Sequence, residues 1–152
     1  MKNWIIILAL GAMVLLFSCE EKQQQQNVDW VSVDDKIITD YLDDNNIEAK
    51  KHVSGLYYRI TQEGNGQHPN GTSIVNVNYK GYFLDGEVFD HQTSIEFPLT
   101  NVIQGWQIGI PLVSKGGSIQ LFIPSYLAYG RQGNRGIPPN TVLLFDVDLI
   151  NF

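Results

Sequence analysis

The chain has 152 residues, enough for one globular domain with accessory segments, and 43% of them are hydrophobic, which suits a packed core. Its 10 basic and 16 acidic residues give a net charge of −6, and Lys and Arg form no cluster, which argues against nucleic-acid binding. Cys19 is the one cysteine, which excludes an intrachain disulfide, and the 3 histidines show no metal-ligand spacing. We therefore expect no metal and no other cofactor.

The N-terminus has the pattern of a secretory signal. Lys2 precedes an uncharged apolar run over residues 4–17, which is shorter than the ~20 residues of a transmembrane helix. The run ends in Leu16-Phe17-Ser18-Cys19, which resembles the bacterial lipobox, where a peptidase cuts before a cysteine that carries diacylglycerol. We predict a lipoprotein signal peptide over residues 1–18 and lipid attachment at Cys19. The alternative is an ordinary signal peptide followed by a chance cysteine.

Residues 19–31 are predicted to form a flexible tether, because Glu20 to Asn27 include no apolar side chain to bury. A lipid anchor before this tether places the chain in the cell envelope, at the outer membrane or the periplasmic face. The acidic pair directly after Cys19 adds surface exposure as an alternative, since similar acidic starts accompany surface export in some lipoproteins.

A short helix is expected within residues 32–54. Ser32 is predicted to cap it, with Asp35 at capping-box spacing, and Asn45 and Asn46 mark its end. One apolar stripe follows helical spacing, made of Ile37, Ile38, Tyr41 and Leu42. We interpret this helix as a spacer packed on the edge of the main domain. A dimerisation helix is the alternative, and the stripe is too short to decide between them.

From Gly55 onward, short alternating apolar runs separated by Gly, Pro, Asn and Asp predict antiparallel strands. Asp85-Gly86 predicts a hairpin turn, and Asp146 and Asp148 give the last strand a face toward water. The inward sets are Leu56, Tyr58 and Ile60; Val75, Val77 and Tyr79; Ile95, Phe97 and Leu99; Ile119, Leu121 and Ile123; and Leu143, Phe145, Val147 and Leu149.

Residues 102–112 depart from the strand period. Val102, Trp106 and Ile110 repeat at helical spacing, and Pro111 and Gly116 close the pattern. One short apolar helix among several strands predicts an α+β fold in which a curved sheet wraps around the helix.

Seven segments then stand out, at residues 77–81, 86–90, 97–99, 102–106, 127–130, 137–141 and 144–149. In order and approximate spacing they resemble the FKBP-type peptidyl-prolyl cis/trans isomerases. The resemblance covers roughly residues 56–152, so we predict an isomerase domain over residues 55–152. It implies an FKBP-like, five-stranded antiparallel half-barrel around one short helix.

The resemblance also implies an enzyme, a peptidyl-prolyl isomerase that assists the folding of envelope proteins without covalent catalysis. Asp90, Tyr129 and Ile103 are the expected catalytic residues: Asp90 hydrogen-bonds Tyr79, and the Tyr129 hydroxyl and the Ile103 backbone N–H hydrogen-bond substrate carbonyls. Proline-containing polypeptides are the expected substrates, and macrolide inhibitors are expected ligands. The expected substrate-binding residues are Tyr79, Phe89, Ile95, Phe97, Val102, Phe145 and Trp106, which forms the pocket floor.

Other interpretations of these residues remain open. Phe145 and Val102 would be core residues in any such sheet, and Asp90 would serve equally as a turn cap. Four positions depart from the family pattern and bear on substrate preference and macrolide affinity: Asn78, His91, Ile95 and Asn134. The alternative function is an FKBP-like binding or chaperone module of an envelope machine, such as that of gliding motility, with little isomerase activity.

Overall fold

The computed structural model describes residues 28–152. The predicted signal peptide, the lipid site at Cys19 and most of the predicted tether lie outside the described residues. Helix α1 (Trp30–Asp44) comes first, so its first two residues fall in the segment predicted as tether. Among residues 28–152, none of the helices combines the length and the apolar composition that crossing a membrane requires.

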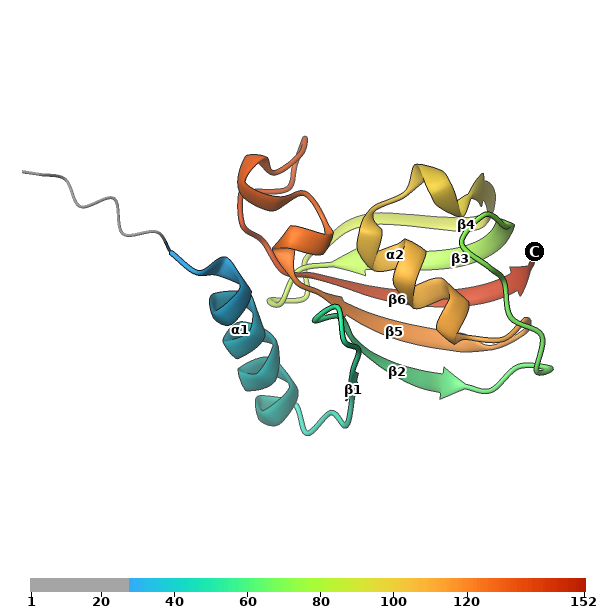
Figure 1. Cartoon of the computed structure of the whole chain (residues 1–152), viewed down its shortest axis with the longest axis horizontal. Helices are drawn as coiled ribbons and strands as arrows, with labels where there is room; N and C mark the ends of the chain where they lie inside the picture. The colour runs from blue at the N-terminus through green and yellow to red at the C-terminus, as the bar shows by residue number, and fades with distance from the viewer. Residues whose placement is uncertain (1–27) are drawn as a thin grey trace, which may run out of the picture.

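A single antiparallel sheet forms the body of the molecule, with the strand order β1-β2-β5-β6-β3-β4 (Figure 1). Its strands are β1 (Lys50–Lys51), β2 (Tyr57–Gln62), β3 (Ile74–Tyr82), β4 (Val88–Pro98), β5 (Ser118–Ile123) and β6 (Leu143–Asn151). The five longer strands match the predicted runs, except that Leu56 precedes β2 and Leu99 follows β4, and the α+β prediction is confirmed. Strand β1 adds two residues to the edge beside β2. Two exposed lysines show no alternation, so no sequence pattern predicted this strand.

Helix α2 (Gln104–Gly109) lies across the concave face of the sheet and is shorter than the predicted 102–112 segment. Val102 and Ile103 have extended backbones, with ψ of 172° and 151°, so the helix begins after them. Four 3-10 turns complete the chain: η1 (Leu99–Asn101), η2 (Ile110–Leu112), η3 (Ser125–Leu127) and η4 (Gly130–Gln132). The alternation of Leu99 with Ile95 and Phe97 had predicted that Leu99 extends the preceding strand. Leu99 instead starts a turn.

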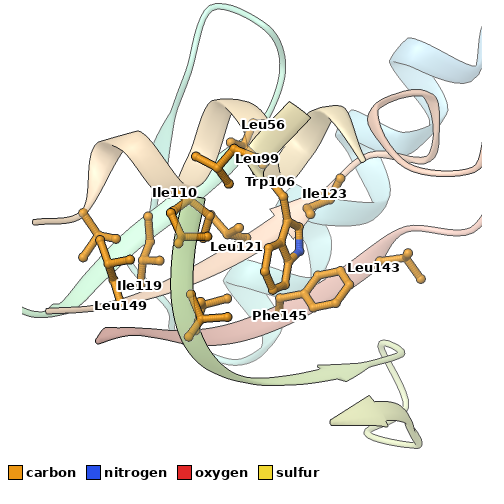
Figure 2. Packing of buried hydrophobic residues seen from close by; sticks show 14 of the residues in the cluster. Leu56, Leu99, Trp106, Ile110, Ile119, Leu121, Ile123, Leu143, Phe145 and Leu149 are labelled. Atoms are coloured by element: carbon orange, nitrogen blue, oxygen red, sulfur yellow. The ribbon is translucent and has the colours of Figure 1, made fainter. Parts of the chain in front are cut away.

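The main core fills the space between α2 and the sheet (Figure 2). The inward residues of β3, β5 and β6 alternate along each strand, and those of α2 and η2 face them, including Trp106 and Ile110. The close approach depends on two helical glycines. A Cβ on Gly105 would lie 2.5 Å from Ile123, and one on Gly109 would lie 2.6 Å from Leu121. Side chains at either position would push the helix off the sheet.

Helix α1 covers the opposite, outer face of the sheet. Ile38 and Leu42 are buried there against outward-facing residues of three strands, Tyr57, Phe122 and Leu144. The helix cap differs from the prediction: the Asp29 carboxylate accepts the Val31 N–H at 3.1 Å and the Ser32 hydroxyl at 2.6 Å. Ser32 therefore lies inside the first turn. Asp146 and Asp148 are also on the outer face, beyond the area that α1 covers, and their side chains bond Tyr82 and Ser118.

Strand β4 pairs with β3 as a hairpin, and Gly86 at its turn has a φ of 88°. Only Gly86 is left-handed in this turn, whereas the two-residue turn predicted from Asp85-Gly86 needs two such residues. The pairing shifts register twice, between Val77 and Tyr79 and between Gly81 and Tyr82. Each shift is a β-bulge that adds one residue to β4.

Candidate functional site

A pocket of about 510 Å³ opens between α2, the concave face of the sheet and the segment after η3. All ten pocket residues predicted from the sequence line it, together with one that was missed, Asn101. The structure thus brings the predicted set to one place, while the catalytic and binding roles of its members stay predictions. The lining residues are Tyr79, Phe89, Asp90, Ile95, Phe97, Asn101, Val102, Ile103, Trp106, Tyr129 and Phe145.

Aromatic rings form the deep end of the pocket. The Trp106 indole is only 4% exposed and meets the Phe145 ring edge to face, at a centroid distance of 5.2 Å and an angle of 89° (Figure 2). The Tyr79 ring meets the indole at the same distance and angle. Phe97 lies 5.6 Å from Trp106, and Phe89 lies 5.5 Å from Phe145. Edge-to-face pairs hold the rings at fixed angles. The deep end is therefore a rigid, apolar surface.

The rings fit because β3 has a glycine beneath them. Gly81 is buried opposite Phe145 in the β3–β6 ladder and opposite Asp90 in the β3–β4 ladder. A Cβ at Gly81 would lie 2.7 Å from both the Phe145 and the Phe89 rings. Any other residue there would move the rings apart, so this glycine sets the shape of the pocket wall.

One polar contact stiffens the rim. The Tyr79 hydroxyl donates to Asp90 Oδ2 at 2.6 Å. Burial, followed by this hydrogen bond, raises the pKa of Tyr79 well above its ordinary value. The phenol is therefore neutral at physiological pH and stays a donor to the carboxylate. Asp90 Oδ1 accepts no side-chain or backbone hydrogen bond from the described residues, and it is free to meet a ligand.

Two further donors reach the pocket without a partner in the described part of the chain. The Ile103 backbone N–H precedes α2 and donates to no carbonyl among residues 28–152, while the Ile103 carbonyl accepts from Trp106 and Gln107. The Tyr129 hydroxyl follows η3 and likewise makes no hydrogen bond within the described residues. The pocket therefore combines an apolar interior with two free donors, and it is suited to hold an apolar ligand by its carbonyl groups.

The side chains that line the pocket are mostly apolar or aromatic. The lining includes no Ser, Cys, Lys or His, and Asp90 is its one carboxylate. Within residues 28–152, no group of three or more His, Cys, Asp and Glu side chains is arranged to hold a metal ion.

A family profile, FKBP-type peptidyl-prolyl cis-trans isomerase, matches residues 65–150. The chain belongs to this family. The FKBP-type isomerase FkpA of Escherichia coli K12 is 43% identical over 107 residues, which are 68% of this chain and 40% of FkpA. The isomerase Mip of Coxiella burnetii is 40% identical over 108 residues, or 68% of this chain and 47% of Mip. The chain thus spans less than half the length of these curated relatives.

Solved structures of FKBP-type isomerases share the fold. The crystal structure of Escherichia coli FkpA matches with a TM-score of 0.71 and 38% identity, over 80% of this chain and 60% of that one. The crystal structure of AtFKBP13 matches with a TM-score of 0.64 and 33% identity, over 68% of this chain and 98% of that one. The first match covers more of this chain than residues 65–150 do.

The four departures from the FKBP pattern lie in different places. Ile95 lines the pocket, whereas Asn134 pairs its backbone with Ile137 in the loop after η4 and does not line it. Asn78 and His91 border a shallow hollow on the outer face of β3 and β4. Asn101 follows Leu99 in η1, and only its place next to Val102 and Ile103 could have pointed to the pocket.

Proposed function

We propose that the chain is a peptidyl-prolyl cis/trans isomerase that acts on proline-containing polypeptides. The observation that carries this proposal is the pocket itself: rigid aromatic rings around Trp106, with free donors at Ile103 and Tyr129. A proline ring is apolar, and the carbonyl groups beside it accept hydrogen bonds, so it matches both parts of the pocket. Macrolides that carry a proline-like ring are the proposed small-molecule ligands of the same site.

Catalysis of this reaction needs no bond to the substrate. Rotation about a peptide bond meets a barrier of ~18–20 kcal/mol, because the C–N bond has double-bond character. The twisted amide has lost this resonance, so its carbonyl is less polar than that of either planar form. An apolar pocket desolvates the twisted form at a smaller cost, which lowers the barrier by binding the transition state more tightly than the ground states. Each tenfold in rate requires ~1.4 kcal/mol of this preference.

The polar residues are proposed to orient the bound amide. The Ile103 N–H and the Tyr129 hydroxyl hold carbonyl oxygens beside the proline and leave the C–N bond free to turn. Asp90 holds the Tyr79 ring in the wall through their 2.6 Å hydrogen bond, and its free oxygen faces the substrate. The pocket then needs no cofactor, which is a proposal that an assay can test.

An isomerase assay on a short X-Pro peptide tests the activity. Residues 28–152 are expected to accelerate cis/trans exchange, a reaction that takes tens of seconds or more without a catalyst. The rate is expected to be the same with and without a strong chelator. Exchange at the uncatalysed rate would favour the binding-module alternative. Activity that chelation removes and metal restores would reveal a metal site.

We propose that the chain is held in the cell envelope by lipid on Cys19, with residues after it serving as a tether. The support is the apolar run at residues 4–17 and the lipobox-like residues 16–19. The full chain is expected to partition with membranes when produced in its bacterial host, and Cys19→Ala is expected to release or mislocalise it. Mass spectrometry that finds an unmodified Cys19, or cleavage elsewhere, would contradict the anchor.

A further inference from the structure

The first β-bulge in the β3–β4 hairpin lies next to the pocket. Val77 pairs with Ile95, and Tyr79 pairs with Gln92. One residue, Asn78, therefore stands opposite two, Thr93 and Ser94. Two residues against one is the arrangement of a bulge, and it reverses the alternation of the β4 residues that lie between it and the second register shift.

This reversal decides whether Asp90 or His91 faces the pocket. Beyond the bulge, Asp90 pairs with Gly81, which faces the pocket beneath the Phe145 and Phe89 rings. Directly opposite residues share a face of the sheet, so Asp90 also faces the pocket. If the register of Val77 and Ile95 continued without a bulge, His91 would stand opposite Gly81. Asp90 would then stand opposite Tyr82, on the outer face.

The bulge requires an unfavourable backbone at Ser94. Its φ is 51°, in the left-handed region that residues other than glycine rarely adopt. A bulge also takes a backbone N–H out of the strand ladder. The Asn78 side chain accepts this N–H: Ser94 N donates to Asn78 Oδ1 at 2.9 Å. The other end of the amide, Nδ2, lies 3.5 Å from Asp148 Oδ2 on β6.

We propose that Asn78 is a positioning residue for the pocket. Through its hydrogen bond to Ser94 it holds the bulge, and the bulge places Asp90, rather than His91, beside the Tyr79 hydroxyl. Asn78 itself points to the outer face and does not line the pocket. Its effect on activity rests on the proposed isomerase function, whereas its effect on the register of β4 does not.

The register can be measured directly in the full chain, kept in solution with detergent. The native register predicts a cross-strand nuclear Overhauser contact between Gly81 and Asp90. Asn78→Ala removes the acceptor for Ser94 N–H, so we expect this contact to weaken and a contact between Gly81 and His91 to appear. Asn76→Ala is the matched control. Asn76 is on the same face of β3, and it accepts a 3.5 Å hydrogen bond from the Ser94 hydroxyl and none from the Ser94 backbone, so the native register is expected to persist.

Glycine at position 94 provides the rescue. A glycine adopts a positive φ without steric cost, so Ser94→Gly is expected to keep the bulge without help from Asn78. Asn78→Ala/Ser94→Gly is therefore expected to regain the Gly81–Asp90 contact. A general loss of stability in Asn78→Ala would not be repaired at this position. If neither Asn78→Ala nor the double variant folds, Asn78 acts on the fold as a whole and the inference is overturned.

Isomerase activity gives the second readout. Loss of the wall contact between Asp90 and Tyr79 is expected to lower kcat/KM of Asn78→Ala by about fivefold to tenfold, in line with the loss of one hydrogen bond of ordinary strength. Asn76→Ala and the double variant are expected to stay near the wild-type value. Asn78→Ala with the native register and full activity would overturn the inference. A wild-type chain without isomerase activity would defeat the proposed function instead, and the register measurement would still decide the role of Asn78.

Discussion

Some pocket side chains stabilise the fold, and others only shape the site. Asp90 is expected to belong to the second kind. Asp90 is exposed and makes its side-chain hydrogen bond to Tyr79, across the pocket wall. Asp90→Val is therefore expected to lower isomerase activity by about tenfold, the loss that ~1.4 kcal/mol of transition-state stabilisation represents. The free energy of unfolding should change little, because the hydrogen bond that is lost is exposed and water can replace Asp90 as the acceptor for the Tyr79 hydroxyl. Peptide assays and urea unfolding on the same sample measure both quantities.

Leu121→Ala is the matched control for that variant. Leu121 is fully buried between α2 and the sheet and does not line the pocket. Its truncation is expected to destabilise the fold by roughly 2–5 kcal/mol. Activity per folded molecule should stay close to wild type. If Asp90→Val kept full activity, the assignment of Asp90 to the site would fail.

Alternation along the strands predicts which side chains face the pocket for some residues but not for Asp90. Alternation places Phe145 and Val77 inward, and the structure has them there. Alternation backward from Phe97 and Ile95, however, predicts His91 on the pocket side and Asp90 on the other. Alternation is wrong here because periodicity does not reveal the bulge at Ser94. The resemblance to FKBP-type isomerases placed Asp90 on the correct side.

Among the elements, α1 shows how strongly a segment outside the family match can be joined to the domain. Asp34 is fully buried, and its Oδ2 accepts the Ser125 backbone N–H at 2.8 Å and the Ser125 hydroxyl at 2.7 Å. Ser125 begins η3, the turn that leads to Tyr129 in the pocket. We therefore expect α1 to unfold together with the domain.

Asp34→Ala is expected to lower the free energy of unfolding by about 1–3 kcal/mol, because it leaves two buried donors of Ser125 without an acceptor. Asp34→Asn keeps an acceptor oxygen and should lose less. Asp40→Ala, which breaks only the exposed pair with Lys36, is the control on the same helix and should change stability by less than ~1 kcal/mol. Urea unfolding of the three variants measures this order. Equal stability of Asp34→Ala and wild type would mean that α1 is a spacer.

The sequence indicated the apolar stripe of α1 but not the surface it covers. Ile38 and Leu42 follow helical spacing, so a packed helix was predictable. Their partners Phe122 and Leu144 lie far along the chain, within strands buried on both faces. Strands of that kind show continuous apolar runs, such as residues 142–145, that do not tell which face an additional helix covers. The Asp29 cap was missed because Ser32 also fits a capping pattern, and the two lie in one turn.

At the scale of the whole molecule, helices pack on both faces of a single sheet. Helix α2 lies on the concave face (Figure 1), where the pocket also opens, and α1 packs on part of the outer face. The order and spacing of the seven segments that resemble FKBP-type isomerases predicted the concave half, even though Tyr79 lies inside β3 and Trp106 in α2. The outer face depends on long-range pairs such as Tyr82 with Asp146 and Gln120, which no local pattern in the sequence predicts.

Tyr82 on the outer face and Tyr79 in the pocket lead to a prediction about the stability of the molecule at alkaline pH. Burial, followed by the charge of Asp146, raises the pKa of Tyr82 above its ordinary value, and burial with the Asp90 hydrogen bond raises that of Tyr79. Near pH ~10 the unfolded chain therefore loses these protons while the folded chain keeps them. The unfolded state then binds fewer protons, so the free energy of unfolding falls as the pH rises. The contribution is fully present below the unfolded pKa.

Urea unfolding between pH ~8 and ~11 measures this fall in the free energy of unfolding. Each such tyrosine lowers it by at most about 1.4 kcal/mol per pH unit. Both side chains are partly exposed, so solvent screening reduces the slope below that limit. Tyr82→Phe removes one titrating group and is expected to make the slope shallower, whatever its effect on stability at pH ~8. The slopes are compared, because at every pH the variant also lacks the hydrogen bond that the Tyr82 hydroxyl donates to Asp146 and the one that it accepts from Gln120. An identical slope in wild type and Tyr82→Phe would show that Tyr82 loses its proton equally in the folded and unfolded chains.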